Sequence, residues 1–163
     1  MSNQLSVETL LQQEAQLTIP QLDAATAFSI GSGALTYAAD QYNGKSVVID
    51  ITAVSGATLF RAYQGQIQPD NELWVKKKRN TTIRYETSSL RFGKELASKG
   101  RTLADKGLDP LEYTNYGGSF PLRLRNAPHI TIAVLTVSGL QDHQDHDVAV
   151  NAIKNVFKIE TTY

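Results

Sequence analysis

The fold is decided by Ser46-Val47-Val48-Ile49-Asp50-Ile51-Thr52, together with the turn signal Ser55-Gly56 and the segment Ala57 to Tyr63 that follows it. The first segment is rich in β-branched residues, which favour the pleated conformation of a strand. Ser55-Gly56 turns the chain and 57–63 is expected to run back, so the sequence predicts a β-hairpin. Strands joined by such short turns pair in the antiparallel sense.

Two helices are expected before this hairpin. Residues 6–17 carry a partial apolar stripe behind Ser6, which can cap the helix N-terminus. Residues 23–42 are mostly small and apolar behind Asp23, a second capping residue. Gly31 and Gly33 disfavour this second helix by about 1 kcal/mol each relative to alanine, unless another element packs closely against them.

Helices and strands alternate in pairs after the hairpin. A third helix is expected from Pro69-Asp70-Asn71, and a further helical stretch from Ser88 to Ser98, ending near Gly100. A loop then covers residues 101–118. Two more strands are expected, Ser119 to Arg125 and Ile130 to Val137, joined by a turn at Asn126-Ala127-Pro128.

The last predicted helix has both an acidic first turn and an apolar face. Asp142 and Asp145 lie in its first turn, where the helix dipole favours negative charge. One face is apolar and comprises Val148, Ala149, Ala152, Ile153, Val156 and Phe157. The predicted order is therefore ααββααββα, which defines an α+β protein with an antiparallel sheet and helices on one or both faces.

Composition limits the class of protein further. The chain has 163 residues, which favours one domain; we expect an N-terminal helix in residues 1–20 and a single α+β domain in 21–163. It has no cysteine, which excludes disulfides, a thiol nucleophile and thiolate metal sites. The N-terminus lacks the features of a secretory signal and the longest apolar run is short, so we expect a cytoplasmic protein without membrane contact.

Charge argues against nucleic acid as a partner, because Lys and Arg (16) equal Asp and Glu (16). The distribution is uneven, however. Residues 61–101 hold ten basic side chains against four acidic ones, a local excess that could attract a small anionic ligand or an acidic partner.

Several short motifs could carry chemistry. His143 and His146 are three residues apart, which places both imidazoles on one side of the last helix, and imidazole binds zinc, copper or haem iron. The alternative is that the aspartates beside them cap the helix and the histidines are ordinary polar residues. His129 follows Pro128 and is expected to be structural or exposed.

Other candidates have equally plain alternatives. The run from Lys76 to Arg79 could bind an anion or form a solvated helix face. Trp74 could stack on a ligand, or lie in the core or an oligomer contact. Ser88-Ser89 could donate hydroxyls or cap a helix, and Gly117-Gly118 could admit a ligand or form a turn. The chain has no Gly-x-Ser-x-Gly elbow or Walker-type loop, and Gly31-Ser32-Gly33 follows no strand, so it is no nucleotide fingerprint.

Three segments resemble one family. They are Asn71 to Thr81 with Arg84-Tyr85 and Ser88-Ser89; Tyr113 with Gly117-Gly118-Ser119-Phe120-Pro121; and Val137-Ser138-Gly139-Leu140 with Asp145-His146. Together they resemble the haem-degrading HbpS-like and GlcG-like family, in its branch of small uncharacterised conserved proteins, over roughly residues 20–158. The chain departs from the pattern at Glu86-Thr87, where relatives often carry His or Arg before the paired serines.

The resemblance implies a profilin-like sandwich, homo-oligomeric assembly, and haem as the possible cofactor. It also implies a set of ligand-binding residues, with His146 as the possible haem iron ligand and the lysines as propionate partners. The set is Lys77, Lys78, Ser88, Ser89, Gly117, Gly118, Asp145 and His146.

Three functions remain open at this point. The first is a haem-binding or haem-degrading-like protein, and the second is a non-enzymatic homo-oligomeric scaffold or adaptor. The third is a small-molecule sensor or a hydrolase-like enzyme that uses Asp145 and His146 as a base, for which the sequence supplies no complete catalytic set.

Overall fold

A computed structural model describes residues 5–163 of the chain, and within them the predicted order ααββααββα is confirmed. The elements are α1 (Val7–Gln16), α2 (Ala24–Gln41), β1 (Val47–Ala53), β2 (Thr58–Gln64), α3 (Asp70–Tyr85), α4 (Ser89–Ser98), the 3₁₀ turn η2 (Ala104–Lys106), β3 (Ser119–Leu122), β4 (Ala133–Ser138) and α5 (Asp142–Phe157).

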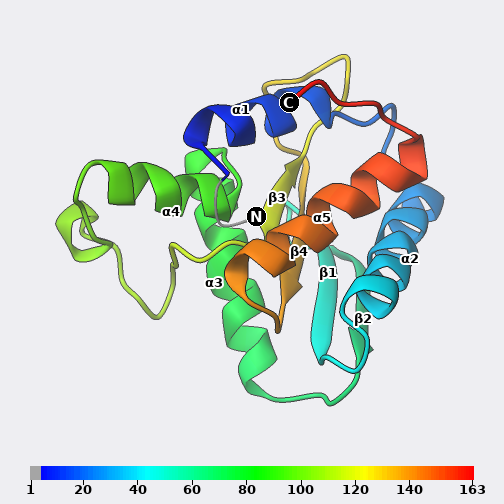
Figure 1. Cartoon of the computed structure of the whole chain (residues 1–163), viewed down its shortest axis with the longest axis horizontal. Helices are drawn as coiled ribbons and strands as arrows, with labels where there is room; N and C mark the ends of the chain where they lie inside the picture. The colour runs from blue at the N-terminus through cyan, green and yellow to red at the C-terminus, as the bar shows by residue number, and fades with distance from the viewer. Residues whose placement is uncertain (1–4) are drawn as a thin grey trace.

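The four strands form one antiparallel sheet in the order β2-β1-β4-β3. Alternate residues of each strand face opposite sides of the sheet. One side is apolar, faces α2 and α5, and forms the main core around Ile49, Leu135 and Phe120, all with no exposed surface. Figure 1 shows α2 and α5 lying together on this side.

The other side of the sheet is largely polar and is covered by α3. It presents Asp50 and Thr136, which are cross-strand neighbours on β1 and β4. Asp50 is buried and accepts hydrogen bonds from Arg61 Nε (2.9 Å) and Thr52 Oγ1 (2.6 Å). The two faces of one sheet therefore differ in chemistry, with apolar packing on one and buried polar side chains on the other.

Helix α1 lies over one end of the sandwich, beside the C-terminal residues of the chain (Figure 1). Gln16 ties the two together, because its side chain donates to Thr162 Oγ1 (3.0 Å) and accepts from Thr162 N (2.9 Å). α1 also packs on α4 and buries Leu10 completely. The domain boundary predicted near residue 20 stays a prediction.

Local signals explain most helix starts. Ser6, Asp23 and Ser88 each accept a hydrogen bond from a backbone amide in the first turn of the helix that follows, so these three caps are confirmed. The capping residue of α5 is Gln141, which forms a reciprocal capping box with Gln144, rather than an aspartate.

The glycines of α2 have a packing reason. A Cβ atom at Gly31 would overlap the ring of Phe60 on β2, and one at Gly33 would lie 3.0 Å from Val156 on α5. The close packing that would excuse glycines in this helix is therefore present.

The second hairpin is shorter than predicted. β3 ends at Leu122 and β4 begins at Ala133, so the expected strands 119–125 and 130–137 overreach into the loop between them. The reason is a competing pairing: Ile19 N donates to Arg123 O and Arg125 N donates to Ile19 O, both at 2.9 Å. This exchange draws the chain away from β4.

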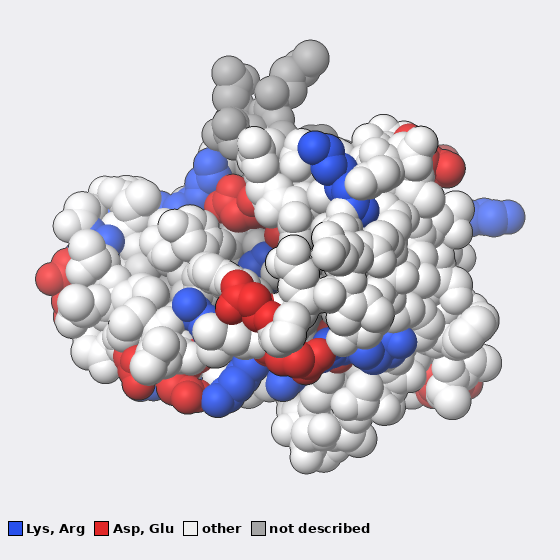
Figure 2. All heavy atoms as spheres, turned by 90° about the horizontal axis from the view of Figure 1, so that it is seen from below, with Lys and Arg blue, Asp and Glu red and all other residues white. Residues whose placement is uncertain are grey.

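Charge is mixed on the surface. Figure 2 shows basic and acidic side chains lying next to each other on the lower face of the molecule. Within residues 5–163, no helix is both long and apolar enough to cross a bilayer.

Candidate functional site

The main cavity, of about 630 Å³, lies between the first turns of α3 and α5. α3 contributes Asp70, Asn71, Trp74 and Lys78, and α5 contributes Asp142, His143 and Asp145; Gln68, Tyr116 and the loop 138–141 complete the lining. The volume falls within the range of about 300–1,000 Å³ that is usual for small-molecule sites. We refer to it as the α3/α5 cavity.

A buried ion pair contributes to the lining of the cavity. Lys78 Nζ lies 2.8 Å from Asp145 Oδ2 and donates a second hydrogen bond to Val137 O at 3.1 Å. Both side chains are almost fully buried. Burial raises the pKa of Asp145, while the ammonium group of Lys78 opposes that rise. An ammonium has three N–H donors, so one donor of Lys78 is not used by these two bonds.

Gly117 and Gly118 let the chain pass close to this ion pair. Gly118 has φ of +136°, and a Cβ atom there would lie 2.9 Å from Lys78 Nζ and 3.0 Å from Asp145 Cβ. A Cβ at Gly117 would lie 2.8 Å from Asp142 O. The two glycines thus serve close packing around the Lys78–Asp145 pair, and four predicted site residues converge at one place.

Aromatic side chains form one wall of the cavity. The rings of Trp74 and Tyr116 lie 5.7 Å apart at an angle of 51°. Trp74 Nε1 donates to Asp70 Oδ2 at 3.0 Å, which fixes the indole. Lys77 places its ammonium group 4.1 Å from the centre of the Trp74 ring, so Lys77 lies beside this wall.

The two histidines occupy different environments. His143 lines the cavity with its side chain 14% exposed, and its Nδ1 lies 3.7 Å from Asp142 Oδ1. His146 is only 1% exposed, its Nε2 shares a hydrogen bond of 2.7 Å with Gln13 Oε1, and its Nδ1 has no hydrogen-bond partner among the described residues. Burial lowers the pKa of His146 to about 4.

The paired serines are buried away from the cavity lining. Ser88 Oγ accepts from Arg91 N (3.2 Å) and caps α4, while Ser89 Oγ accepts from Ser119 N (3.1 Å) on β3. Neither hydroxyl lies beside a histidine in the described hydrogen-bond network. Across residues 5–163, no group of three or more His, Asp and Glu is arranged to hold a metal ion.

Some lining residues carry no sequence signal of their own. Tyr116 is half exposed in a loop, and Asp70 looks like an ordinary first-turn acid. Their convergence depends on the antiparallel return of β4, which brings residues 138–145 next to α3. The adjacent Gly117-Gly118 was the one available hint that the loop carrying Tyr116 makes a close contact.

Fold and cavity together define an α+β sandwich with a small-molecule pocket between two helix N-termini. The family model for the haem-degrading HbpS-like proteins matches residues 22–154, and the chain belongs to this family. It is 35% identical to a UPF0303 protein of Rhizobium etli over 144 residues, which cover 88% of this chain and 85% of that protein.

Two solved structures are similar in fold. The crystal structure of Ybr137w matches with a TM-score of 0.89 and 27% identity, covering 98% of this chain and 92% of that one. The crystal structure of a PduOC–haem complex matches with a TM-score of 0.67 and 20% identity, covering 89% of this chain and 100% of that one.

Proposed function

We propose that the protein binds a small molecule in the α3/α5 cavity, and that haem is the first ligand to test. The observation that carries the proposal is the cavity itself, with an aromatic wall, a partly exposed imidazole and a buried ammonium. Membership of the HbpS-like family supports haem as the ligand, as does the haem bound to PduOC in a structure of the same fold.

The residues present fit haem through His143 more readily than through His146. Imidazole is the usual axial ligand of haem iron, and a neighbouring carboxylate such as Asp142 orients a ligating histidine. Gln13 occupies His146 Nε2, so ligation by His146 would require α1 to move. When bound, haem would supply an iron centre, and the protein would supply the ligand, the aromatic wall and the exclusion of water.

In this proposal some of the remaining predicted residues contact the ligand directly, and the others hold those residues in place. Lys78, with its unused donor, is the anchor for an acidic group of the ligand, and Lys77 lies beside Trp74 for a second one. Asp145 holds Lys78, and Gly117 and Gly118 hold the surrounding backbone. Ser88 and Ser89 contribute indirectly, because Ser88 caps α4 and Ser89 accepts a hydrogen bond from Ser119 N at the start of β3.

A hemin titration of the full chain, followed at the Soret band, tests the proposal. We expect saturable binding that His143→Ala weakens at least about tenfold, because an axial ligand is lost. His146→Gln, which keeps a hydrogen-bonding partner for Gln13, is expected to bind like the wild type. Loss of hemin binding in His146→Gln but not in His143→Ala would mean that His146, under α1, binds the iron instead. If the wild type gives no Soret shift, haem is excluded as the ligand.

A second candidate function is a non-enzymatic homo-oligomeric scaffold. Phe28 is 65% exposed on α2 and its ring lies 6.0 Å from that of Phe60 on β2, one of the two edge strands of the described sheet. An exposed aromatic beside an open strand edge is suited to a subunit contact. Light scattering on the wild type and on Phe28→Ser tests it: a monomeric wild type removes this reading. A cytoplasmic location and the absence of a nucleic-acid partner stay predictions.

A further inference from the structure

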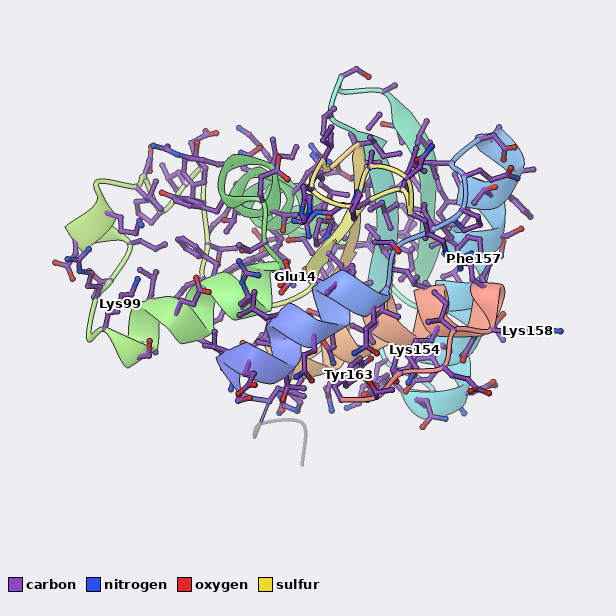
Figure 3. All side chains as sticks on the ribbon, turned by 90° about the horizontal axis from the view of Figure 1, so that it is seen from above. Glu14, Lys99, Lys154, Phe157, Lys158 and Tyr163 are labelled. Atoms are coloured by element: carbon purple, nitrogen blue, oxygen red, sulfur yellow. The ribbon has the colours of Figure 1, made fainter. Side chains whose placement is uncertain are left out.

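A second hollow, of about 180 Å³, lies at the C-terminal end of α4, in the lobe at the left of Figure 1. Its walls come from the end of α3, from α4, and from the turn that follows α4. Four basic side chains line it, namely Arg91, Lys99, Arg101 and Lys106. Lys99, at the end of α4, is labelled in Figure 3. None of the lining residues is shared with the α3/α5 cavity.

The positive charge of this hollow is not neutralised locally. Glu95 is the single carboxylate that lines it among the described residues, and Arg91 engages it at 3.2 Å. Arg91 also contacts the buried Glu14 at 3.2 Å, so its charge is shared between two carboxylates. Within residues 5–163, Lys99, Arg101 and Lys106 form no ion pair with a carboxylate. Three cations therefore surround one small space in a chain whose net charge is zero.

The cations are carried by a firmly held turn. Arg101 N donates to Leu96 O at 2.9 Å, and Thr102 N donates to Asp105 Oδ2 at 2.8 Å. Lys106 places its ammonium group 4.9 Å from the centre of the Tyr85 ring, which stacks on Phe92 at 4.5 Å. The backbone that carries these cations is thus ordered before any ligand arrives, which reduces the entropic cost of binding.

We propose that this hollow is a binding site for a small oxyanion, of the chemical class of phosphate or a phosphate monoester. A guanidinium and two ammonium groups donate charge-assisted hydrogen bonds to phosphate oxygens, and arginine can do so with two parallel bonds. The volume corresponds to roughly six water molecules, enough for one phosphoryl group and little more. The site is separate from the α3/α5 cavity and stands whether or not haem binds there.

Titration of the ¹⁵N-labelled full chain with inorganic phosphate, at low ionic strength, tests the site. We expect saturable shifts of backbone amides in residues 99–106. The double variant Lys99→Gln/Arg101→Gln should weaken binding at least about tenfold, because two charge-assisted bonds are lost. A matched control, Lys45→Gln/Arg125→Gln, removes one exposed lysine and one exposed arginine elsewhere and should bind within about twofold of the wild type.

A second titration, with phenyl phosphate, distinguishes free phosphate from a phosphate group carried by a larger molecule. Tighter binding than phosphate supports the phosphate end of a larger molecule, and equal binding supports free phosphate; both agree with the site. Equal weakening in the two double variants would indicate diffuse attraction to the surface and would overturn the proposal. Shifts that do not saturate, or that avoid residues 99–106, would overturn it as well.

Discussion

Helix α5 has two neighbours of opposite character. Toward the sheet and α2 it buries aliphatic side chains such as Ala149 and Ile153 in the main core. Its His146 also reaches a polar layer under α1, which we define as Gln13, Glu14, Arg91, Arg123 and His146 and which lies mainly between α1, α4 and the segment after β3. Figure 3 shows Glu14 on α1, facing the body of the protein. The main core is held by burial of apolar area, whereas the polar layer adds hydrogen bonds and charge to the buried Leu10 of α1.

The polar layer leaves more groups unsatisfied than the main core does. Of the six buried side-chain polar atoms that lack a hydrogen-bond partner among the described residues, four belong to it: Glu14 Oε2, Arg91 Nε, Arg123 Nε and His146 Nδ1. Glu14 Oε2 and Arg91 Nε still have ionic partners at 3.2 Å, namely Arg91 and Glu95. Arg123 Nε and His146 Nδ1 have none, and such an atom costs on the order of 1–3 kcal/mol when it is desolvated without a partner. α1 lies outside residues 22–154, the region that matches the family.

The largest expected effect belongs to the main core. Leu135→Ala on the central strand β4 should lower the free energy of unfolding by about 2–5 kcal/mol, because a fully buried side chain is lost and a cavity is left. Leu11→Ala, at a side chain that is 46% exposed on α1, should change it by less than about 0.5 kcal/mol. Urea unfolding of both variants measures the difference. Equal losses would mean that α1 is integrated as tightly as the sheet.

The next largest effect is the pH dependence that the polar layer gives to the free energy of unfolding. Burial raises the pKa of Glu14 from 4.5 to about 7, although Arg91 and Arg123 oppose it. The contribution of Glu14 is therefore complete below pH 4.5 and is lost as the pH rises toward 7. Burial lowers the pKa of His146 from 6.5 to about 4. Its contribution is complete above pH 6.5 and is lost as the pH falls toward 4.

The two opposite slopes should cancel in the wild type between pH 4.5 and 6.5. Glu14→Gln removes one of them, so unfolding free energy should then decline on acidification below pH 6.5, by up to about 3 kcal/mol at pH 4. His146→Gln should show the reverse, a decline from pH 4.5 to 7. Glu112→Gln, on an exposed carboxylate, is the control and should keep the wild-type profile. Parallel profiles in all four proteins would contradict the buried titration of both groups.

The same contrast explains what the sequence could predict. Periodicity and turn signals suffice for the apolar elements: the alternating strands β1 and β4, the caps Ser6, Asp23 and Ser88, and the element order all follow from local patterns. The end of β3 does not follow from a local pattern. It depends on the backbone hydrogen bonds between Ile19 and the segment after β3, and only the tertiary fold brings these two parts of the chain together.

The candidate site divides in the same manner. Lys78, Gly118 and Asp145 were predicted through a family resemblance and do converge in the structure. The roles of the two histidines depend instead on how α1 docks, since Gln13 covers His146 and leaves His143 at the cavity. A helical spacing of three residues places both imidazoles on one side of a helix, but the angle of about 60° between them is enough to put one in the core and the other at a cavity.

The smallest expected effect concerns the C-terminal tail, which lies on α1. Gln16→Ala removes both side-chain hydrogen bonds to Thr162, and since they are exposed to solvent the loss should be about 0.5–1 kcal/mol. Hydrogen exchange should accelerate in α1 and in residues 158–163, where opening is local, and stay unchanged in β1 and β4. Gln12→Ala, on the exposed side of the same helix, is the matched control and should alter neither. Faster exchange in β4 as well would show that α1, the tail and the sheet open as one cooperative unit. The distinction between the main core and the polar layer would then be one of chemistry without a difference in local stability.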